Sequence, residues 1–262
     1  PAKHLASLCN QMVNFLGIMQ NEWAGAQAFS SFDTYLAPFV KADNLSYEQV
    51  KKCVESFIYG VNTPSRWGTQ APFSNITLDW TVPADLADRP AIIGGKEMPF
   101  TYGECKREMD MVNKAFIEVM IEGDANGRGF QYPIPTYSIT RDFDWSETEN
   151  NRLLFEMTAK YGTPYFSNYI NSDMEPSDVR SMCCRLRLDL RELRKKSGGF
   201  FGSGESTGSV GVVTINMPRI GYLSENESDF YHRLDHMMDI AARSLKIKRT
   251  VISKLLDEGL YP

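Results

Sequence analysis

Hydrophobic positions recur every three to four residues in several stretches of the chain, which is the spacing of an amphipathic helix. Residues 5–23 show this spacing first, and residues 46–59 show it again. Ser46 and Gln49 form a capping box that marks the start of the second helix. Similar Ser/Thr–Glu pairs predict three more helices, which begin at Thr101, Ser146 and Ser224 and extend to about residues 123, 160 and 258.

Other stretches favour strands. Residues 73–80 alternate and are rich in β-forming side chains, and shorter candidates lie at 137–140 and 165–170. Residues 210–215 form a continuous, mostly β-branched run, which is typical of a strand covered on both faces. Strands that alternate with helices predict an α/β protein with a parallel sheet. Because only four to six strands are expected, an open sheet or part of a larger barrel fits better than a closed eight-stranded barrel.

Composition narrows the class of protein. A length of 262 residues corresponds to one large domain or two small ones. The net charge of −5 argues against non-specific binding to nucleic acids or membranes, and no apolar run is long enough to span a bilayer. Five scattered cysteines and the lack of a secretion signal predict a reducing, cytoplasmic environment. Because the chain opens on Pro1 and runs directly into a helical pattern, we expect it to be a piece of a longer protein.

Two common catalytic patterns find little support. His232 and His236 are spaced to share one helix face, but no third ligand is evident, so no metal site is predicted. The glycine-rich residues 198–204 lack the Gly-Lys-Ser/Thr of a phosphate-binding loop and precede a strand instead of following one.

Residues 62–75 concentrate hydrogen-bonding side chains, one Arg, one Trp and two prolines just before a predicted strand. Binding groups accumulate on loops that a scaffold positions. Arg66 could therefore clamp a phosphate while neighbouring amides read a sugar or base edge. A well-capped turn without a ligand explains the same residues equally well.

Cys183 and Cys184 are adjacent and lie among several arginines, of which Arg180, Arg185 and Arg187 are nearest. Positive neighbours stabilise a thiolate and lower the pKa of a cysteine. The alternative is that the two thiols are small buried groups and the arginines pair with nearby acids. The residues alone leave open whether a functional sulfur here acts as a nucleophile, a redox partner or a radical.

Three motifs in this order carry a resemblance to a known family. They are Ser-Arg-x-Gly-x-Gln-x-Pro-Phe-Ser at 65–74, Met-x-Cys-Arg at 182–185 and Gly-Val-Val-Thr-x-Asn-x-Pro-Arg-Ile at 211–220. Together with residues 20–27, they make nearly the whole chain similar to the anaerobic (class III, glycyl-radical) ribonucleoside-triphosphate reductases.

The resemblance implies a fold and a reaction. The family has a ten-stranded α/β barrel in which a finger loop carries a cysteine to the centre. That cysteine becomes a thiyl radical and removes the 3′ hydrogen of the ribose, after which the 2′ hydroxyl leaves as water. The matching catalytic residue here is Cys184, with Cys183 auxiliary at most. The implied substrate-binding residues are Arg66, Gly68, Gln70 and Ser74, with Asn216 and Pro218 on the strand beside them.

The resemblance also implies what lies elsewhere. Residues 1–262 would be a single segment of the catalytic barrel, without the ATP-binding cone, the glycyl-radical loop or the four-cysteine zinc site, and inactive alone. No cofactor is expected within this segment. The complete enzyme is expected to carry the glycyl radical and the zinc, to be activated by an iron–sulfur, S-adenosylmethionine-dependent partner, and to form a homodimer. Ribonucleoside triphosphates would be substrates, and ATP and deoxynucleotides would be allosteric effectors. Ser209 stands where some members have Asn, so no role is carried over to it.

Two other functions remain open at this point. A nucleotide-binding or assembly module built on the same barrel would leave Cys184 idle. Another glycyl-radical enzyme would act on a small organic substrate instead of a nucleotide.

Overall fold

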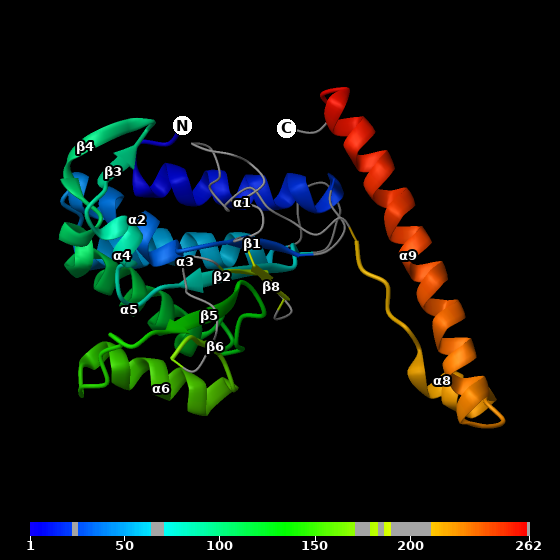
Figure 1. The fold of residues 1–262 in the computed structure, drawn as a ribbon. Helices are drawn as coiled ribbons and strands as arrows, with labels where there is room; N and C mark the ends of the chain where they lie inside the picture. The colour runs from blue at the N-terminus through cyan, green and yellow to red at the C-terminus, as the bar shows by residue number, and fades with distance from the viewer. Residues whose placement is uncertain (23–25, 64–70, 171–178, 183–185, 190–210, 261–262) are drawn as a thin grey trace. The chain divides into compact units, whose positions relative to one another are not determined.

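The computed structural model describes residues 1–22, 26–63, 71–170, 179–182, 186–189 and 211–260. The chain divides into two compact units, Pro1–Ser206 and Thr207–Pro262. The first unit contains a parallel sheet with its helices, and the described part of the second, residues 211–260, contains two helices (Figure 1).

The central sheet has four parallel strands in the order β1-β2-β5-β6. Residue pairs such as Gln27 with Ser74 and Thr77 with Thr136 fix the register. Successive parallel strands need crossover connections, and helices supply them here. The prediction of an α/β protein with a parallel sheet is therefore confirmed. The strands are β1 (Gln27–Phe29), β2 (Ser74–Leu78), β5 (Ile134–Ile139) and β6 (Tyr165–Asn168).

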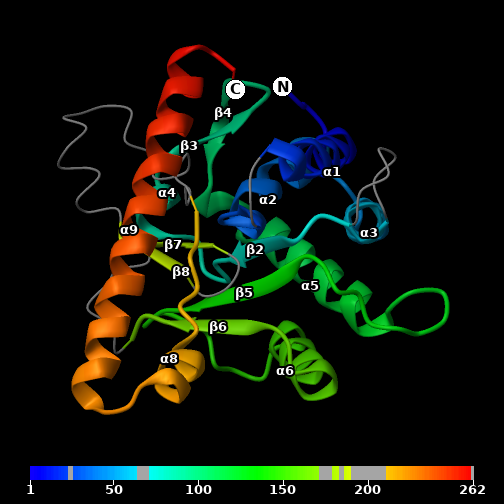
Figure 2. The same ribbon diagram turned by 90° about the vertical axis from the view of Figure 1, so that its right-hand side faces the viewer.

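The helices of this unit share one hydrophobic core with the sheet. Side chains from the helices pack with Ile76 and Leu78 of β2 and with Tyr137 and Ile139 of β5. One face of the sheet is therefore covered by helices (Figures 1 and 2). The helices that contribute to this core are α1 (Leu5–Glu22), α2 (Phe32–Ala42), α3 (Tyr47–Asn62), α5 (Lys106–Glu122) and α6 (Glu149–Tyr161).

Two antiparallel hairpins accompany the sheet. The first joins β3 (Pro90–Ile93) to β4 (Lys96–Thr101), between the short helix α4 (Ala84–Ala87) and the 3₁₀ turn η1 (Gly103–Cys105). The second joins β7 (Val179–Met182) to β8 (Leu186–Asp189), and β7 contacts β1. Figure 2 shows both hairpins.

Most of the predicted helices are confirmed, with shifted starts. The Ser46–Gln49 capping box is present at the start of α3. α6 is capped by Thr148 instead of Ser146. Glu104 accepts from the backbone N–H of Thr101 as expected, but α5 begins only at Lys106 because the 3₁₀ turn comes first.

The predicted strand at 210–215 is wrong. Residues 211–216 have no regular secondary structure, and the second unit consists of α8 (Met217–Leu223) and α9 (Glu227–Asp257) in its described part. A β-branched run needs a neighbouring strand to pair with, and the described residues of this unit offer none. α9 is capped by Asn226 instead of Ser224.

Candidate functional site

The two faces of the parallel sheet differ in chemistry. Side chains alternate between the faces of a strand, so Ile76 and Leu78 point to one face and Asn75 and Thr77 to the other. The register places Thr136 of β5 on the same face as Thr77. The face away from the helical core is therefore polar. Its side chains on β2, β5 and β6 include Asn75, Thr77, Thr136, Ser138 and Ser167.

A buried pair lies at the centre of this polar face. Asn75 Nδ2 donates to Thr136 Oγ1 across 3.2 Å. Only 2% of Asn75 and 5% of Thr136 is exposed. Asn75 Oδ1 has no hydrogen-bond partner among the described residues. The pair thus holds a free acceptor next to a hydroxyl group, away from solvent.

Asn62 organises the edge of the sheet where these strands begin. Its Nδ2 donates to the carbonyl oxygen of Tyr132 across 2.5 Å, and its Oδ1 accepts from the backbone N–H groups of Gln131 and Tyr132. The Tyr132 ring also packs against Phe73, with centroids 5.2 Å apart. The end of α3 is therefore tied to the segments that lead into β2 and β5.

The predicted substrate-binding residues fall into three groups. Arg66, Gly68 and Gln70 lie outside the described residues, as do the predicted catalytic residue Cys184 and the auxiliary Cys183. Ser74 is the first residue of β2 and is buried. By alternation its side chain shares the face of Ile76, opposite Asn75.

Asn216 and Pro218 form the third group, and their predicted place on a strand is wrong. Asn216 caps α8, where its Oδ1 accepts from the backbone N–H of Arg219 across 3.0 Å. Pro218 lies in the first turn of α8, where a residue without an N–H is well tolerated. Contact of either residue with a substrate stays a prediction.

Asn75 is the last residue of the polar segment 62–75, but neither Asn75 nor Thr136 was among the substrate-binding residues that the family resemblance implied. The alternation within 74–78 contains a signal for Asn75, because Ile76 and Leu78 are the obvious core positions. Thr136 lies one residue before the strand that the sequence predicted, so its face could not be assigned.

A second buried polar cluster lies where β2 ends and α2 begins. Asp33 accepts four hydrogen bonds, from the backbone N–H groups of Thr34, Asp79 and Trp80 and from Asn113 Nδ2. Burial raises the pKa of Asp33, while these donors favour its charged form. The carboxylate joins α2, β2 and α5, which is a structural task.

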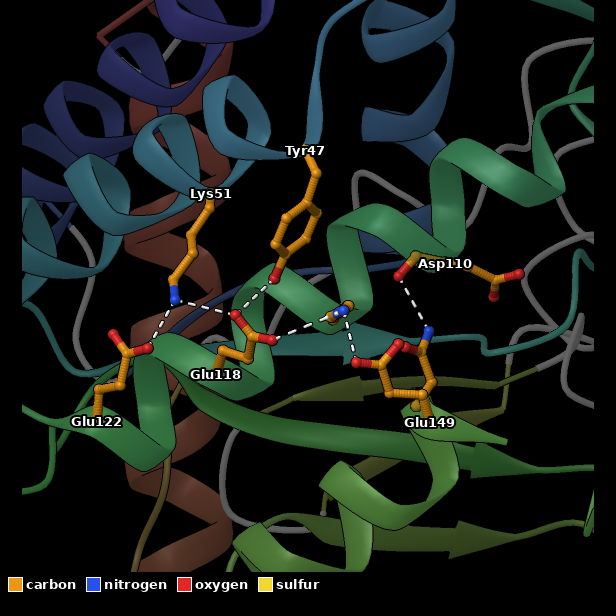
Figure 3. Close-up of polar contacts among 8 residues, drawn as sticks. Tyr47, Lys51, Asp110, Glu118, Glu122 and Glu149 are labelled. Atoms are coloured by element: carbon orange, nitrogen blue, oxygen red, sulfur yellow. Dashed lines mark hydrogen bonds and ion pairs between the residues drawn. The ribbon is translucent and has the colours of Figure 1, made fainter. Parts of the chain in front are cut away.

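Charged side chains on the helices also form a connected network (Figure 3). Glu118 accepts from Tyr47 Oη at 2.7 Å and from Lys51 Nζ at 2.9 Å, and Lys114 reaches Glu149 at 2.7 Å. Although partial burial opposes it, hydrogen bonds from Tyr47 and Lys51 lower the pKa of Glu118. Because these groups are already paired with one another, the network holds α3, α5 and α6 together and offers no free catalytic group.

A surface pocket of about 430 Å³ lies between α1 and α3. Its lining includes Cys9 and Cys53, together with His4 and Asp43, which are hydrogen-bonded to each other. Burial, and then the neighbouring Cys53, raises the pKa of Cys9 to about 12, and burial also raises the pKa of Cys53. Both thiols are therefore protonated near neutral pH and are poor nucleophiles.

Within the described ranges, no three His, Cys, Asp or Glu side chains come together in a way that could hold a metal ion. His232 and His236 both lie on α9. None of the helices in the described part of the chain is both long and apolar enough to cross a bilayer.

Comparisons with solved structures show what the fold is similar to. The anaerobic ribonucleotide reductase of Thermotoga maritima with citrate in the active site matches 99% of this chain with a TM-score of 0.70 and 20% identity. The same reductase in complex with dATP and CTP matches 100% of the chain with a TM-score of 0.68 and 19% identity. The chain covers 46% and 42% of those two chains, so it spans less than half of the solved relatives. It shares the fold of part of that enzyme.

Sequence comparisons point the same way. The anaerobic ribonucleoside-triphosphate reductase of Haemophilus influenzae is 27% identical over 141 residues, which are 52% of this chain and 19% of that protein. The family profile described as anaerobic ribonucleoside-triphosphate reductase matches residues 1–262. Because that match extends over the whole sequence, this chain belongs to the anaerobic ribonucleoside-triphosphate reductase family.

Proposed function

We propose that this chain is a catalytic segment of an anaerobic ribonucleotide reductase, which converts ribonucleoside triphosphates to 2′-deoxyribonucleoside triphosphates. The observation that carries the proposal is the family match over residues 1–262. The two-faced sheet supports it: one face packs in the helical core, while the other presents buried amide and hydroxyl groups. Polar groups shielded from water suit a reaction that passes through reactive intermediates.

Cys184 is the proposed reacting residue. Its sulfur-centred radical takes the hydrogen atom from C3′ of the ribose, so that an S–H bond forms as the C3′–H bond breaks and the unpaired electron moves to carbon. The 2′ hydroxyl group then takes up a proton and leaves as water. A two-electron reductant, formate or a dithiol, supplies two electrons, and a proton adds at C2′. The hydrogen atom on the sulfur returns to C3′, which regenerates the thiyl radical. Arg66, Gly68 and Gln70, with Asn216 and Pro218, are the proposed substrate-binding residues. Ser74 is left out of this set, because its side chain lies on the face of β2 that packs in the helical core.

The radical itself must come from outside these residues. The sequence has no Arg-x-x-Gly-Tyr-x-Gly segment and no cluster of four cysteines. The residues present therefore do not fit a glycyl radical or the zinc site of the family, and no step is assigned to either group here.

Nucleotide ligands and partners belong to the same proposal. The Thermotoga maritima enzyme has been solved in complex with dATP and CTP. We extend nucleotide binding to this chain, both as substrate and as allosteric effector. Homodimer formation, activation by a partner enzyme and a cytoplasmic location follow from the family resemblance.

The test compares C184S with C183S in the activated reductase that contains this chain, under anaerobic conditions. Because only Cys184 is proposed to carry the radical, C184S should abolish formation of deoxyribonucleotides. C183S is the matched control and should retain turnover. Full turnover by C184S would favour a non-catalytic nucleotide-binding module. Binding of small organic acids or diols in place of ribonucleotides would point to another glycyl-radical enzyme.

A further inference from the structure

The unpartnered oxygen of Asn75 differs from the other unpartnered polar atoms in the described core. Ser74 Oγ lies on the apolar face of β2, and Tyr137 Oη belongs to the face that packs in the helical core. Glu108 Oε2, Asn113 Oδ1 and Asn151 Oδ1 belong to helices α5 and α6. Of the unpartnered atoms in the described core, Asn75 Oδ1 is therefore the one on the polar face of the sheet, beside a hydroxyl group. Leaving a buried carbonyl oxygen without a donor is costly, so such a group calls for a partner.

The hydrogen bond between the two side chains determines which donor and acceptor groups of each remain available for a ligand. Asn75 uses its amide nitrogen as the donor, and Thr136 uses its oxygen as the acceptor. The hydroxyl hydrogen of Thr136 takes part in no hydrogen bond among the described residues. The pair therefore presents one acceptor, Asn75 Oδ1, and one donor, the Thr136 hydroxyl, next to each other.

The charge of the polar face narrows the class of ligand. The side chains on this face of β2 and β5 are Asn75, Thr77, Ile134, Thr136 and Ser138, and none is charged. Among the described side chains of β2 and β5, a phosphate or carboxylate would meet a carbonyl oxygen with no cation beside it. A neutral group that both donates and accepts fits, and an alcohol does both through one oxygen.

We propose that Asn75 and Thr136 bind the ribose hydroxyl groups of the nucleotide, with Asn75 accepting from one hydroxyl and Thr136 donating to the sugar. This inference rests on the proposed function and adds two residues to it. Adjacent hydroxyl groups distinguish a ribonucleotide from its deoxy counterparts. The pair is thus a specificity determinant for the sugar.

The test measures dissociation constants of a ribonucleoside triphosphate and of its 2′-deoxy and 3′-deoxy analogues, by equilibrium dialysis of the complete reductase at saturating effector. T136V removes the hydroxyl and keeps the shape of the side chain. It should weaken binding of the ribonucleotide about tenfold, the value of one hydrogen bond, while the analogue that lacks the contacted hydroxyl binds as before. N75L should likewise reduce the preference for the ribonucleotide over its deoxy analogue. T136S keeps a hydroxyl group at position 136 and should therefore retain the preference that T136V loses.

T34V is the matched control, because Thr34 is also buried and its Oγ1 donates to Asp79 at 2.6 Å, in the other polar cluster. For each variant, the dissociation constant of the deoxy analogue is divided by that of the ribonucleotide. This ratio does not depend on the fraction of folded protein, so a merely destabilising change leaves it unaltered. Ratios for T136V and N75L equal to that of T34V would overturn the assignment of the pair while leaving the reductase proposal intact. If the unaltered enzyme binds no ribonucleotide, the proposed function fails as well.

Discussion

Replacing Asp33 by Asn tests how the sheet is joined to its helices. The carboxylate of Asp33 is completely buried and accepts from the backbone N–H groups of Asp79 and Trp80 at 2.8 and 2.9 Å, from Asn113 at 2.9 Å and from Thr34 at 3.1 Å. In D33N, one carboxylate oxygen becomes an NH₂ group, which would face donors instead of accepting from them.

The structure sets the size of the effect. Asn113 Nδ2 and the Trp80 N–H both donate to Oδ2 of Asp33, so two buried donors lose their acceptor if the new amide nitrogen takes that place. An unsatisfied buried donor costs about 1–3 kcal/mol, which predicts a loss of about 2–6 kcal/mol in the free energy of unfolding. For a unit of this size, the melting temperature should fall by at least about 4 °C.

Urea denaturation followed by circular dichroism gives the free energy directly. Asp85 is the matched control, because it is exposed, and D85N should change stability by less than about 0.5 kcal/mol. If D33N is as stable as D85N, the carboxylate is not held by its four donors and the reasoning is refuted.

Three further predictions follow from single positions. Gly123 ends α5 with a φ of 77°, and an added Cβ would meet the carbonyl oxygen of Arg128 at 2.5 Å. G123A should therefore lower the free energy of unfolding in urea by at least about 1–3 kcal/mol. G221A is the control: its new Cβ lies in open space on α8, so it should be neutral or stabilising. Equal stabilities would contradict the turn geometry. The pKa of Glu118 is lowered in the folded state from 4.5, so its stabilising effect is present above that value and is lost as the pH falls through the folded-state pKa. E118Q should therefore lower stability by up to about 1 kcal/mol at pH 7 and converge with the unaltered chain in strong acid; a constant difference at all pH values would refute this. N62A removes an amide that makes four hydrogen bonds, so it should lower the free energy of unfolding by about 2–6 kcal/mol. A decrease of less than about 1 kcal/mol would show that Asn62 does not tie α3 to the segment before β5.

The sequence predicted the fold class and most helices because those features depend on local periodicity. α1 and α3 have clear apolar spacing, and the Ser46 capping box is a strong start signal. α2 was not predicted, because Pro38 lies inside it and a proline normally ends a helical pattern. The hairpin of β3 and β4 was also not predicted, although Gly94 and Gly95 between its strands are a recognised turn signal.

Errors in the strands have a different origin. Residues 210–215 have the composition of a buried strand, but pairing depends on a partner that local sequence does not specify. The predicted position of Asn216 and Pro218 was wrong for the same reason. Both were placed on that strand, but they lie at the start of α8.

The candidate site was only partly accessible from the sequence. Motif resemblance identified Ser74, and the structure adds Asn75 on the opposite face of the same strand. Thr136 lies 61 residues away and meets Asn75 only because β2 and β5 pair in parallel register. Such a pair depends on the sheet order, which no spacing along the chain indicates.

The central claim is that a radical on Cys184 of this chain cleaves the C3′–H bond of a ribonucleotide. The most direct measurement follows deoxyribonucleotide formation from a ribonucleoside triphosphate carrying deuterium at C3′, by mass spectrometry, with the activated enzyme and with its C184S variant. We expect slower turnover of the deuterated substrate by the unaltered enzyme and no product from C184S. Equal product from both enzymes, formed without any effect of the deuterium, would contradict the claim.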